Sequence, residues 1–527
     1  MNPGPLSVDQ LRHMAQHHPH ELAYRDLDVG AGITFADWEA QSNRLARGLV
    51  SRGVRRGDRV AVYLPSEHCL RWIVAYAAVH KAGAVAVPAN TRLSEPEIVT
   101  ILRHAEVAAV VTCAALLDHV RAVRAAVPAL HTVISIDGGG DAVPWADALD
   151  ADASTFQVPV DKNDLADIMY TSGTTGLPKG VAVRHRNIAM IPNNEPTWTG
   201  RGWLHGAPLF TFAGLAFVFN PMKMGLTALY LPKFDAGRWM QVVEREKPVM
   251  SLIVPAMAEL IVAHPDFSHH DLSSLVMVSI GSAPVAPKTL LTLQERLPQA
   301  TVSNSYGMSE AGPAFIVMPK EEVTNRIGSV GRPMPPMEAK VVDEQGDDLP
   351  AGEVGELLTR LPGRQREYYR DEAATAQTWT DDGWLRTGDL GYFDHDGFLY
   401  LVGRKKDVII RGGNNVYATD VEAVVIEHPA VREVAVVGMP HPVLGEDVAA
   451  FVVVKEGVAV TVDELGAFCA ERLADYKRPR QLHFVGELPR NATGKVMKHL
   501  LRHPEPTVGF RRGRPGPGAG SGARPGR

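Results

Sequence analysis

Cysteine is scarce in this sequence. The three cysteines, Cys69, Cys113 and Cys469, lie far apart and form no CxxC pair. Disulfide-stabilised folds and structural zinc sites use numerous or closely spaced cysteines. The sequence therefore predicts free thiols in a reducing compartment and excludes a disulfide framework as the basis of the fold.

A basic excess and a long apolar run are also absent. The formal net charge is −6, which gives no electrostatic reason to expect a nucleic acid or an anionic membrane as partner. No stretch reaches the roughly 18 uninterrupted apolar residues that a transmembrane helix needs. The N-terminal segment MNPGPLSVDQLRHMAQHHPHELAY lacks the basic and apolar regions of a signal peptide. We therefore expect a cytoplasmic protein that neither spans a membrane nor binds nucleic acid.

What the sequence does contain is an ordinary globular composition with a regular alternation of strand and helix. Hydrophobic residues make up 45% and charged residues 22% of the 527 residues, enough for more than one core. A capping box, Ser94 with Glu97, predicts the start of one helix, and Ser66 is expected to cap another that ends near Ala82. The alternation is typical of parallel sheets covered by helices on both faces. Buried strands are predicted at 59–64, 84–89, 107–112 and 132–137.

The pattern changes twice further along the chain. From about residue 340 it becomes β-rich, with KVVDEQGDDLPAGEVGELLTR predicting a hairpin, and a smaller α+β unit is expected at 403–503. Residues 504–527 are mostly Gly, Pro and Arg and are expected to be disordered. The predicted class is α/β. A large N-terminal domain, 1–402, has parallel sheets covered by helices plus a β-rich subdomain, and a small mobile α+β domain follows it.

Glycine, threonine and one lysine gather at residues 170–180, YTSGTTGLPKG. Glycine lets backbone amides converge on an anion, while hydroxyl groups and a cation add further donors. The strand-like DLADIMY precedes the segment, which places it at a strand end. It is not a Walker A motif, because Pro178 stands where that motif needs its second glycine. The residues alone predict a phosphate-binding loop, with an ordinary surface turn as the alternative.

The string TSGTTGLPKG resembles the phosphate loop of the adenylate-forming superfamily, which includes acyl- and aryl-CoA synthetases, adenylation domains and luciferases. Four further strings resemble motifs of that family and follow in its order. They are SNSYGMSE (303–310), GWLRTGDLG (383–391), GRKKDVIIRGGNNVYATDVE (403–422) and LPRNATGKVMK (488–498). The resemblance covers about residues 10–503. It implies an acyl-CoA synthetase that uses ATP, Mg²⁺ and coenzyme A.

The resemblance implies a role for each motif of the large domain. Thr174 and Lys179 would act on the phosphates as catalytic residues, and Glu310 would bind Mg²⁺, a hard cation suited to carboxylate and phosphate oxygens. Tyr306 would stack on adenine, and Asp389 would accept hydrogen bonds from the ribose. The other residues of the large domain that the resemblance places at ATP or AMP are Thr171, Ser172, Gly173, Thr175, Gly176, Gly281, Ser282, Ala283, Pro284, Asn304, Ser305, Gly307, Met308 and Ser309, and Arg404 of the small domain is placed there as well.

The remaining implied roles fall in the small domain. Lys495 would bridge the substrate carboxylate and the α-phosphate, and so counts as both catalytic and AMP-binding. Lys406 occupies the hinge position, about which the small domain would turn after adenylation. Gly412 and Gly413 would lie beside the pantetheine arm of coenzyme A, where a side chain would block the thiol.

The segment PLFTFAGLAFVF (208–219) corresponds to the acyl-pocket motif of the family, with Phe210, Thr211, Phe212, Ala213 and Gly214 expected to line the pocket. Thr211 stands where many CoA ligases have histidine. No acidic residue here could pair with the amine of an amino acid, so the residues favour a hydrophobic acid: fatty, aryl or a bulky natural-product carboxylate. The phenylalanines are also compatible with a plain core.

Several alternatives remain open at this point. An acyl-AMP ligase would pass the acyl group to a carrier protein, although ligases of that kind have an insertion at the domain junction that 390–407 lacks. Luciferase-like oxidation requires no additional motif. An inactive nucleotide-binding scaffold would be expected to lack Lys495, Glu310 or Asp389, and all three are present. The expected partners are a small-molecule carboxylic acid, ATP and coenzyme A, with a homodimer as a further expectation.

Overall fold

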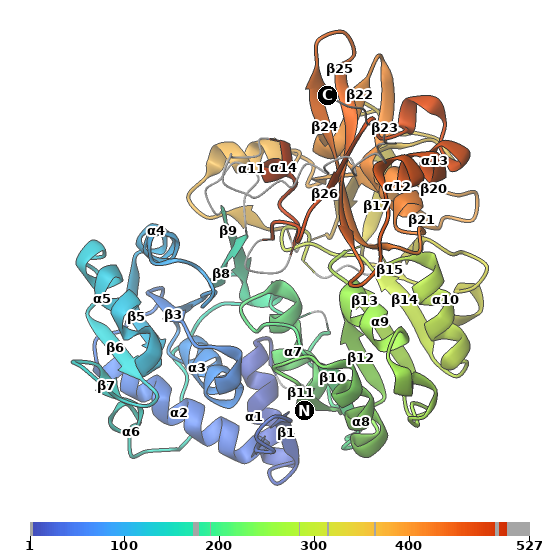
Figure 1. Ribbon diagram of the computed structural model, residues 1–527. Helices are drawn as coiled ribbons and strands as arrows, with labels where there is room; N and C mark the ends of the chain where they lie inside the picture. Colours follow the sequence, from blue (N-terminus) through green and yellow to red (C-terminus); the bar gives the residue numbers. More distant parts are fainter. Residues whose placement is uncertain are drawn as a thin grey trace, which may run out of the picture. The chain divides into compact units, whose positions relative to one another are not determined.

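The structure is a computed structural model, shown in Figure 1. It describes residues 4–171, 179–189, 191–283, 285–312, 316–362, 365–490 and 495–502. The chain forms two compact units, and the division falls between Leu401 and Val402.

The first sheet of the first unit has eight strands in the order β19-β9-β8-β4-β3-β5-β6-β7. Their bounds are Arg59–Val62 (β3), Val85–Pro88 (β4), Val107–Thr112 (β5), Thr132–Ser135 (β6), Val143–Pro144 (β7), Leu165–Thr171 (β8), Lys179–Arg184 (β9) and Glu367–Tyr368 (β19). The pairs β8–β4, β4–β3, β3–β5, β5–β6 and β6–β7 are parallel. The pairs β8–β9 and β9–β19 are antiparallel. The parallel strands predicted from the sequence are confirmed.

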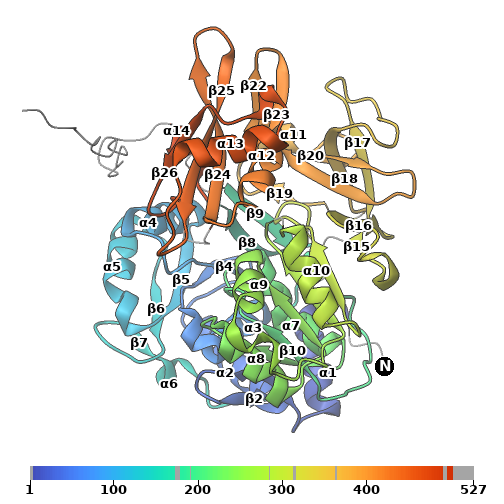
Figure 2. The ribbon, with the colours of Figure 1, turned by 45° about the vertical axis from the view of Figure 1, so that its right-hand side comes forward.

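Helices cover both faces of this sheet, because side chains alternate along each strand. Val60 and Val62 belong to a core with α2 (Phe35–Ser51) and α3 (Cys69–Lys81). Ala61, between them, packs with α4 (Glu95–Ala105) and α5 (Leu117–Ala126). Figure 2 shows α4 and α5 on one side of the strands and α2 and α3 on the other. The first unit also contains α1 (Ser7–His17), α6 (Trp145–Ala148) and α11 (Glu372–Thr378).

The helix starts test two sequence predictions. The capping box of α4 is confirmed, with the Ser94 backbone N–H donating to Glu97 Oε2 at 2.8 Å. The cap predicted at Ser66 is wrong. Ser66 begins a 3-10 turn, Ser66–His68, and α3 starts only at Cys69. A tight turn after Pro65 therefore takes the place of the first turn expected for the α-helix.

The second sheet has seven strands in the order β14-β13-β12-β10-β11-β1-β2, all parallel except the β1–β2 pair. The strands are Leu22–Asp26 (β1), Gly32–Thr34 (β2), Gly202–His205 (β10), Thr227–Tyr230 (β11), Met250–Ile253 (β12), Met277–Gly281 (β13) and Thr301–Ser305 (β14). Its helices are Phe212–Lys223 (α7), Ala236–Glu246 (α8), Pro255–Val262 (α9) and Pro287–Arg296 (α10). The carboxyl ends of β13 and β14 lie side by side, with Gly281 opposite Ser305.

A third sheet is antiparallel, in the order β15-β16-β21-β20-β18-β17. Its strands are Ile316–Val317 (β15), Ser329–Pro333 (β16), Glu338–Val342 (β17), Gly355–Arg360 (β18), Leu385–Phe393 (β20) and Leu399–Arg404 (β21). The β17–β18 hairpin is the one predicted from KVVDEQGDDLPAGEVGELLTR, so the β-rich region is confirmed. The chain passes from the first unit to the second within β21.

The second unit is a small α+β fold, as predicted. Its sheet has the order β23-β22-β25-β24, with β26 added in parallel to β25. The elements are Val408–Arg411 (β22), Asn414–Tyr417 (β23), Val431–His441 (β24), Gly445–Val454 (β25), Gln481–Phe484 (β26), Ala418–Val425 (α12), Val462–Arg472 (α13) and Lys498–Arg502 (α14). The tail predicted to be disordered, 504–527, lies outside the described residues.

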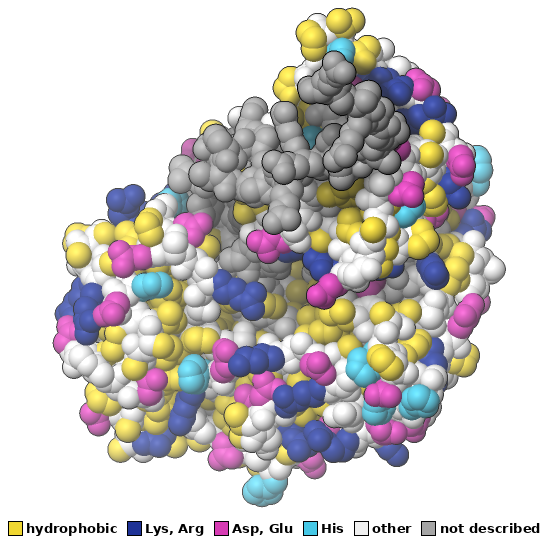
Figure 3. Space-filling view, in the orientation of Figure 1, with side chains coloured by type: hydrophobic (Ala, Val, Ile, Leu, Met, Phe, Trp, Pro, Cys, Tyr) yellow, Lys and Arg dark blue, Asp and Glu magenta, His cyan; other side chains and the backbone are white. Residues whose placement is uncertain are grey.

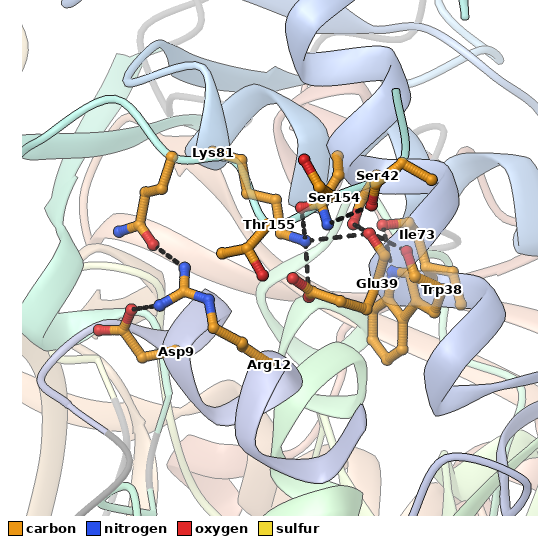
Figure 4. A network of polar contacts seen from close by, with 12 residues as sticks. Asp9, Arg12, Trp38, Glu39, Ser42, Ile73, Lys81, Ser154 and Thr155 are labelled. Atoms are coloured by element: carbon orange, nitrogen blue, oxygen red, sulfur yellow. Dashed lines mark hydrogen bonds and ion pairs between the residues drawn. The ribbon is translucent and has the colours of Figure 1, made fainter. Parts of the chain in front are cut away.

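A buried ion pair joins α2 to α3 in the first unit. Lys81 Nζ lies 2.6 Å from Glu39 Oε2 and 2.7 Å from Asn43 Oδ1, and its side chain is fully buried. Burial lowers the pKa of Lys81 to about 8. Figure 4 shows this network, in which Trp38 of α2 also donates to the Ile73 carbonyl oxygen of α3 at 3.1 Å. The two helices are therefore fixed to one another by polar contacts inside an apolar core.

The surface and the helices agree with the composition. On the face shown in Figure 3, basic and acidic side chains are interspersed. In the described part of the chain, no helix combines the length and the hydrophobicity that a bilayer crossing needs. The three cysteines are free and buried.

Candidate active site

Two predicted nucleotide-binding residues touch one another beside the second sheet. Tyr306 follows the end of β14, and its hydroxyl donates to Asp389 Oδ2 at 2.6 Å. Asp389 lies in β20 with only 6% of its surface exposed, and its own backbone N–H donates to Thr387 Oγ1. The motifs predicted for adenine and for ribose, 83 residues apart, therefore meet through a short hydrogen bond.

The end of β13 is the second feature of this region. Ser282, directly after Gly281, has a φ of 75°, in the left-handed region that residues with a side chain rarely adopt. Such conformations cost about 1–3 kcal/mol and cluster at functional sites. Gly281 and Ala283 flank it, and Pro284 lies outside the described residues. The strained turn therefore falls within the segment that the sequence predicted to line the nucleotide.

A carboxylate and two hydroxyl groups come together at the end of β8. Glu310 Oε1 lies 3.5 Å from Thr171 Oγ1 and 3.3 Å from the hydroxyl of Tyr368. The ammonium of Lys179 lies 4.8 Å from the centroid of the Tyr368 ring, in a cation–π contact. The structure thus brings Thr171, Lys179 and Glu310 together around Tyr368, a residue that the sequence reasoning missed.

This cluster suits a cation that arrives with its own ligands. Mg²⁺ usually takes one or two carboxylates and completes its shell with substrate phosphates and water. Within the described ranges, no set of three His, Cys, Asp or Glu side chains is placed to hold a metal ion. Glu310 with its neighbouring oxygens therefore fits a nucleotide-bound metal, and a metal cage built from protein alone is not found among these residues.

Arg366 is the second residue that sequence reasoning missed. Its guanidinium donates to the Ser309 carbonyl oxygen and, at 2.9 Å, to the Asn187 carbonyl oxygen, and it lies 5.2 Å from the centroid of the Phe212 ring. The side chain is only 3% exposed, and burial lowers its pKa to about 10. The surrounding string, QREYYRD, is polar, so no sequence signal marked this arginine as buried.

The predicted acyl-pocket residues lie at the start of α7. Thr211 is the N-cap: its hydroxyl accepts from the Gly214 N–H at 3.1 Å and donates to the Pro208 carbonyl oxygen at 2.7 Å. Phe210, Thr211, Phe212 and Ala213 are half-buried. A Cβ atom at Gly214 would come within 2.0 Å of the Pro208 carbonyl oxygen, so the missing side chain allows close backbone packing.

The remaining predicted residues of the first unit are placed as follows. Asn304 and Ser305 end β14, Gly307 and Met308 follow it, and Ser309 begins the turn that contains Glu310. Sequence predictions for part of the phosphate loop lie outside the described residues; these are Ser172, Gly173, Thr174, Thr175 and Gly176.

The second unit carries the other predicted residues. Gly412 and Gly413 form the turn between β22 and β23 with φ angles of 58° and 82°. Two successive positive φ values are typical of a type I′ hairpin, and a Cβ atom at Gly413 would meet no atom within 4 Å. Lys495 precedes α14, and Arg404 and Lys406 lie at the end of β21 and in the 3-10 turn Lys405–Asp407.

Comparison with known proteins supports one family. The model of the AMP-binding enzyme family matches residues 11–369, and that of the AMP-binding enzyme C-terminal domain matches residues 420–495. The chain is 33% identical over 522 residues to a long-chain-fatty-acid–CoA ligase of Bacillus subtilis (strain 168), covering 90% of each chain. It is 36% identical over 500 residues to a feruloyl-CoA synthase of an Amycolatopsis species, covering 93% of this chain and 96% of the relative.

A solved structure agrees with these sequence matches. The anthranilate CoA ligase AuaEII, in complex with anthranoyl-AMP, superposes with a TM-score of 0.84 at 28% identity, covering 94% of this chain and 96% of AuaEII. The similarity therefore extends over both units and is not limited to the nucleotide-binding strings. The chain belongs to the AMP-binding enzyme family, as an acyl-CoA synthetase of the adenylate-forming superfamily.

Proposed function

We propose that the protein activates a hydrophobic carboxylic acid with ATP, releases pyrophosphate, and transfers the acyl group from acyl-AMP to coenzyme A, giving acyl-CoA and AMP. The observation that carries this proposal is the convergence of residues from separate motifs. Thr171 contacts Glu310, and Tyr306 contacts Asp389. In each pair the two residues are more than 80 positions apart in the sequence. We assign the Thr171–Glu310 contact to the phosphate end of the nucleotide and the Tyr306–Asp389 contact to its nucleoside end.

The chemistry explains why these residue types are needed. A carboxylate is a poor electrophile, and joining it to AMP supplies a phosphate leaving group that a thiol can displace. The first step brings two anions together, so preorganised donors and cations must offset their repulsion. We assign this role at the phosphates to Lys179 and, by resemblance, Thr174, and at the carboxylate and α-phosphate to Lys495.

Glu310 is the proposed Mg²⁺ ligand. When bound, the metal would supply charge neutralisation of the nucleotide phosphates. Glu310 would orient it, and the Thr171 hydroxyl at 3.5 Å would keep the carboxylate in place. At the other end, Tyr306 would pack against adenine while Asp389 accepts from the ribose hydroxyl groups.

The second unit would serve both half-reactions. By resemblance, it turns about Lys406 after adenylation, which withdraws Lys495 and brings Gly412 and Gly413 to the pantetheine arm. The type I′ turn favours glycine at both positions, because their φ angles are positive. Domain motions of this kind control the rate of turnover in many enzymes.

The acid is proposed to be hydrophobic. The first turn of α7 presents Phe212 and Ala213 half-buried, and no acidic side chain lies among 208–214 to pair with an amine. The curated relatives that act on fatty and aryl acids are consistent with this class. Whether the acid is fatty or aryl is an outcome of the experiment below.

The alternative acceptor is a carrier protein. Between β20 and β21 only 394–398 intervene, and the 3-10 turn Lys405–Asp407 follows directly, so no insertion interrupts this stretch. Because carrier-loading ligases of the family have an insertion there, the compact stretch favours coenzyme A. A cytoplasmic location and a homodimer stay predictions.

One experiment separates these functions. Purified protein is incubated with ATP, Mg²⁺ and a panel of fatty, aryl and amino acids, and acid-dependent pyrophosphate exchange is measured before coenzyme A is added. Exchange followed by thioester formation supports the proposal. Exchange without a CoA thioester supports carrier transfer, and ATP binding without exchange for any acid supports an inactive scaffold.

A further inference from the structure

Arg366 contacts three segments that are far apart in sequence. It donates to the carbonyl oxygen of Ser309, the residue before Glu310, and to that of Asn187, which follows β9. Its guanidinium also lies over the ring of Phe212, the first residue of α7. One side chain therefore contacts the turn that carries Glu310, the segment that follows β9 and the predicted acyl-pocket segment.

The location of Arg366 in the chain makes these contacts possible. Arg366 directly precedes β19, which pairs with β9, the strand that follows the predicted phosphate loop. Tyr368 of β19 contacts Glu310, and Arg366, two residues earlier, contacts Ser309. One short segment therefore contacts both Glu310 and the residue before it. Gly312 leaves room for the arginine, because a Cβ atom there would lie 3.2 Å from the guanidinium carbon.

The charge of Arg366 is balanced by two carboxylates. Burial lowers its pKa, while Asp167 and Glu310 act in the opposite direction. Asp167 on β8 is itself buried and fixed, since it accepts from the Tyr76 hydroxyl at 2.9 Å and contacts His80 Nε2 at 2.9 Å. The guanidinium is therefore under the electrostatic influence of a fixed carboxylate and of the proposed metal ligand, in addition to its bonds to two carbonyl groups.

We propose that Arg366 is a positioning residue for the adenylation step: by holding the Ser309 and Asn187 carbonyl groups and the Phe212 ring, it sets the place of Glu310 relative to the acyl pocket. This inference rests on the proposed function, because it takes Glu310 as the metal ligand and α7 as the wall of the acyl pocket. Arg366 itself does not contact Glu310 through a hydrogen bond, so it acts through the turn that carries Glu310.

Positioning and simple electrostatics predict opposite results for metal binding. Replacing Arg366 by methionine removes the donor to the Ser309 and Asn187 carbonyl groups and loosens the Glu310 turn, which weakens Mg²⁺ binding. If the arginine acted only as a nearby positive charge, its removal would strengthen Mg²⁺ binding. Substitution of a residue that holds a metal ligand in place typically lowers the affinity for the metal about 10–100-fold.

The test compares Arg366→Met and Arg366→Lys with wild type. Lysine keeps the charge but cannot hold both carbonyl groups with one fixed fork. The matched control is Arg184→Gln, which breaks the exposed Arg184–Glu367 ion pair of 2.7 Å on the same β9–β19 pairing. Glu310→Gln serves as the reference for a damaged metal site.

Two readouts are collected for each protein. The first is the melting temperature with ATP alone and with ATP over a Mg²⁺ titration, which reports binding without turnover. The second is pyrophosphate exchange over a titration of the best acid from the panel. We expect Arg366→Met to raise the half-saturating Mg²⁺ concentration and the KM of the acid about tenfold, Arg366→Lys to raise both by less, and Arg184→Gln to leave both unchanged.

The outcomes are distinguishable. A half-saturating Mg²⁺ concentration that is unchanged or lowered in both Arg366 variants overturns the proposal, even if their melting temperatures fall, because a purely structural role would lower stability alone. If Arg366→Met does not fold, the Arg366→Lys titration decides by the same criterion. If the wild type gains no Mg²⁺-dependent stabilisation from ATP, the proposed function fails, and the role of Arg366 fails with it.

Discussion

The hydroxyl of Tyr306 lies 2.6 Å from the carboxylate of Asp389, and this bond joins the residue proposed for adenine to the residue proposed for ribose. Tyr306 follows a strand of a parallel sheet, and Asp389 lies in a strand of the antiparallel sheet. A small shift of one sheet relative to the other would therefore change the distance between the residue proposed for adenine and the residue proposed for ribose.

Tyr306→Phe is predicted to weaken ATP binding. The ring remains for stacking, but the buried Asp389 loses a donor, which costs about 1 kcal/mol for a typical hydrogen bond. We expect the KM for ATP to rise about fivefold, as that energy implies, while the KM of the acid stays unchanged. The control is Tyr392→Phe on the same strand β20, whose ring stacks on Tyr400. Equal ATP KM values in the two variants would contradict the assignment.

Lys495→Ala is predicted to separate the two half-reactions. Loss of one preorganised donor to a developing charge costs about 3–4 kcal/mol, a factor of roughly 10²–10³ in rate. Pyrophosphate exchange should fall by that factor, whereas thioester formation from supplied acyl-AMP and CoA should persist. Lys498→Ala is the control, because Lys498 pairs with Glu422 at 2.8 Å within the second unit. A comparable loss in both half-reactions would refute the proposal of two conformations.

Thr211→Ala is predicted to destabilise the start of α7. The hydroxyl of Thr211 caps the helix through the Gly214 N–H, and loss of an N-cap costs about 1 kcal/mol. The urea midpoint should fall, and the KM of the acid should rise because Phe212 and Ala213 belong to the first turn. Thr211→Ser keeps the cap and should behave as wild type. A Thr211→Ser variant as impaired as Thr211→Ala would show that the methyl group, not the cap, is what matters.

Stability is predicted to rise with pH through the titration of Lys81. Its pKa is lowered by burial to about 8 in the folded protein, against 10.5 for the ordinary side chain. Between these two values the unfolded chain holds a proton that the folded protein has released, so the contribution of Lys81 to the free energy of unfolding increases with pH in this window. The free energy of unfolding of wild type, measured relative to that of a Lys81→Met, Glu39→Gln double variant, should therefore increase with pH. The measurement is urea unfolding at pH 7.5, 9 and 10. Parallel curves for the two proteins would contradict it.

The parts of the fold that sequence predicts well are those specified locally. The apolar runs of β3 to β6, the capping box at Ser94 and the β17–β18 hairpin each depend on neighbouring residues, and each is present. Ser66 shows the limit of such reasoning, because a cap-forming residue after a proline is equally compatible with a 3-10 turn.

The parts of the site that sequence misses depend on distant pairing. Tyr368 and Arg366 reach Glu310 and Ser309 only because β19 adds to β9 across more than 180 positions, and neither residue lies in a glycine-rich or charged motif. Glu310 itself was found because a motif surrounds it. Gly214 illustrates a third case, since the pattern indicates a small residue but not that the Pro208 backbone occupies the space.

The pairing of β19 with β9 also bears on how the protein is made. Until the ribosome has produced residues 367 and 368, the outer edge of β9 has no partner on that side, and an uncovered edge invites association with other chains. Nascent chains that end before this point would carry an open edge at β9 and would lack Tyr368, which contacts Glu310. This edge of β9 should therefore stay uncovered during synthesis until the short strand β19 has left the ribosome and paired with it.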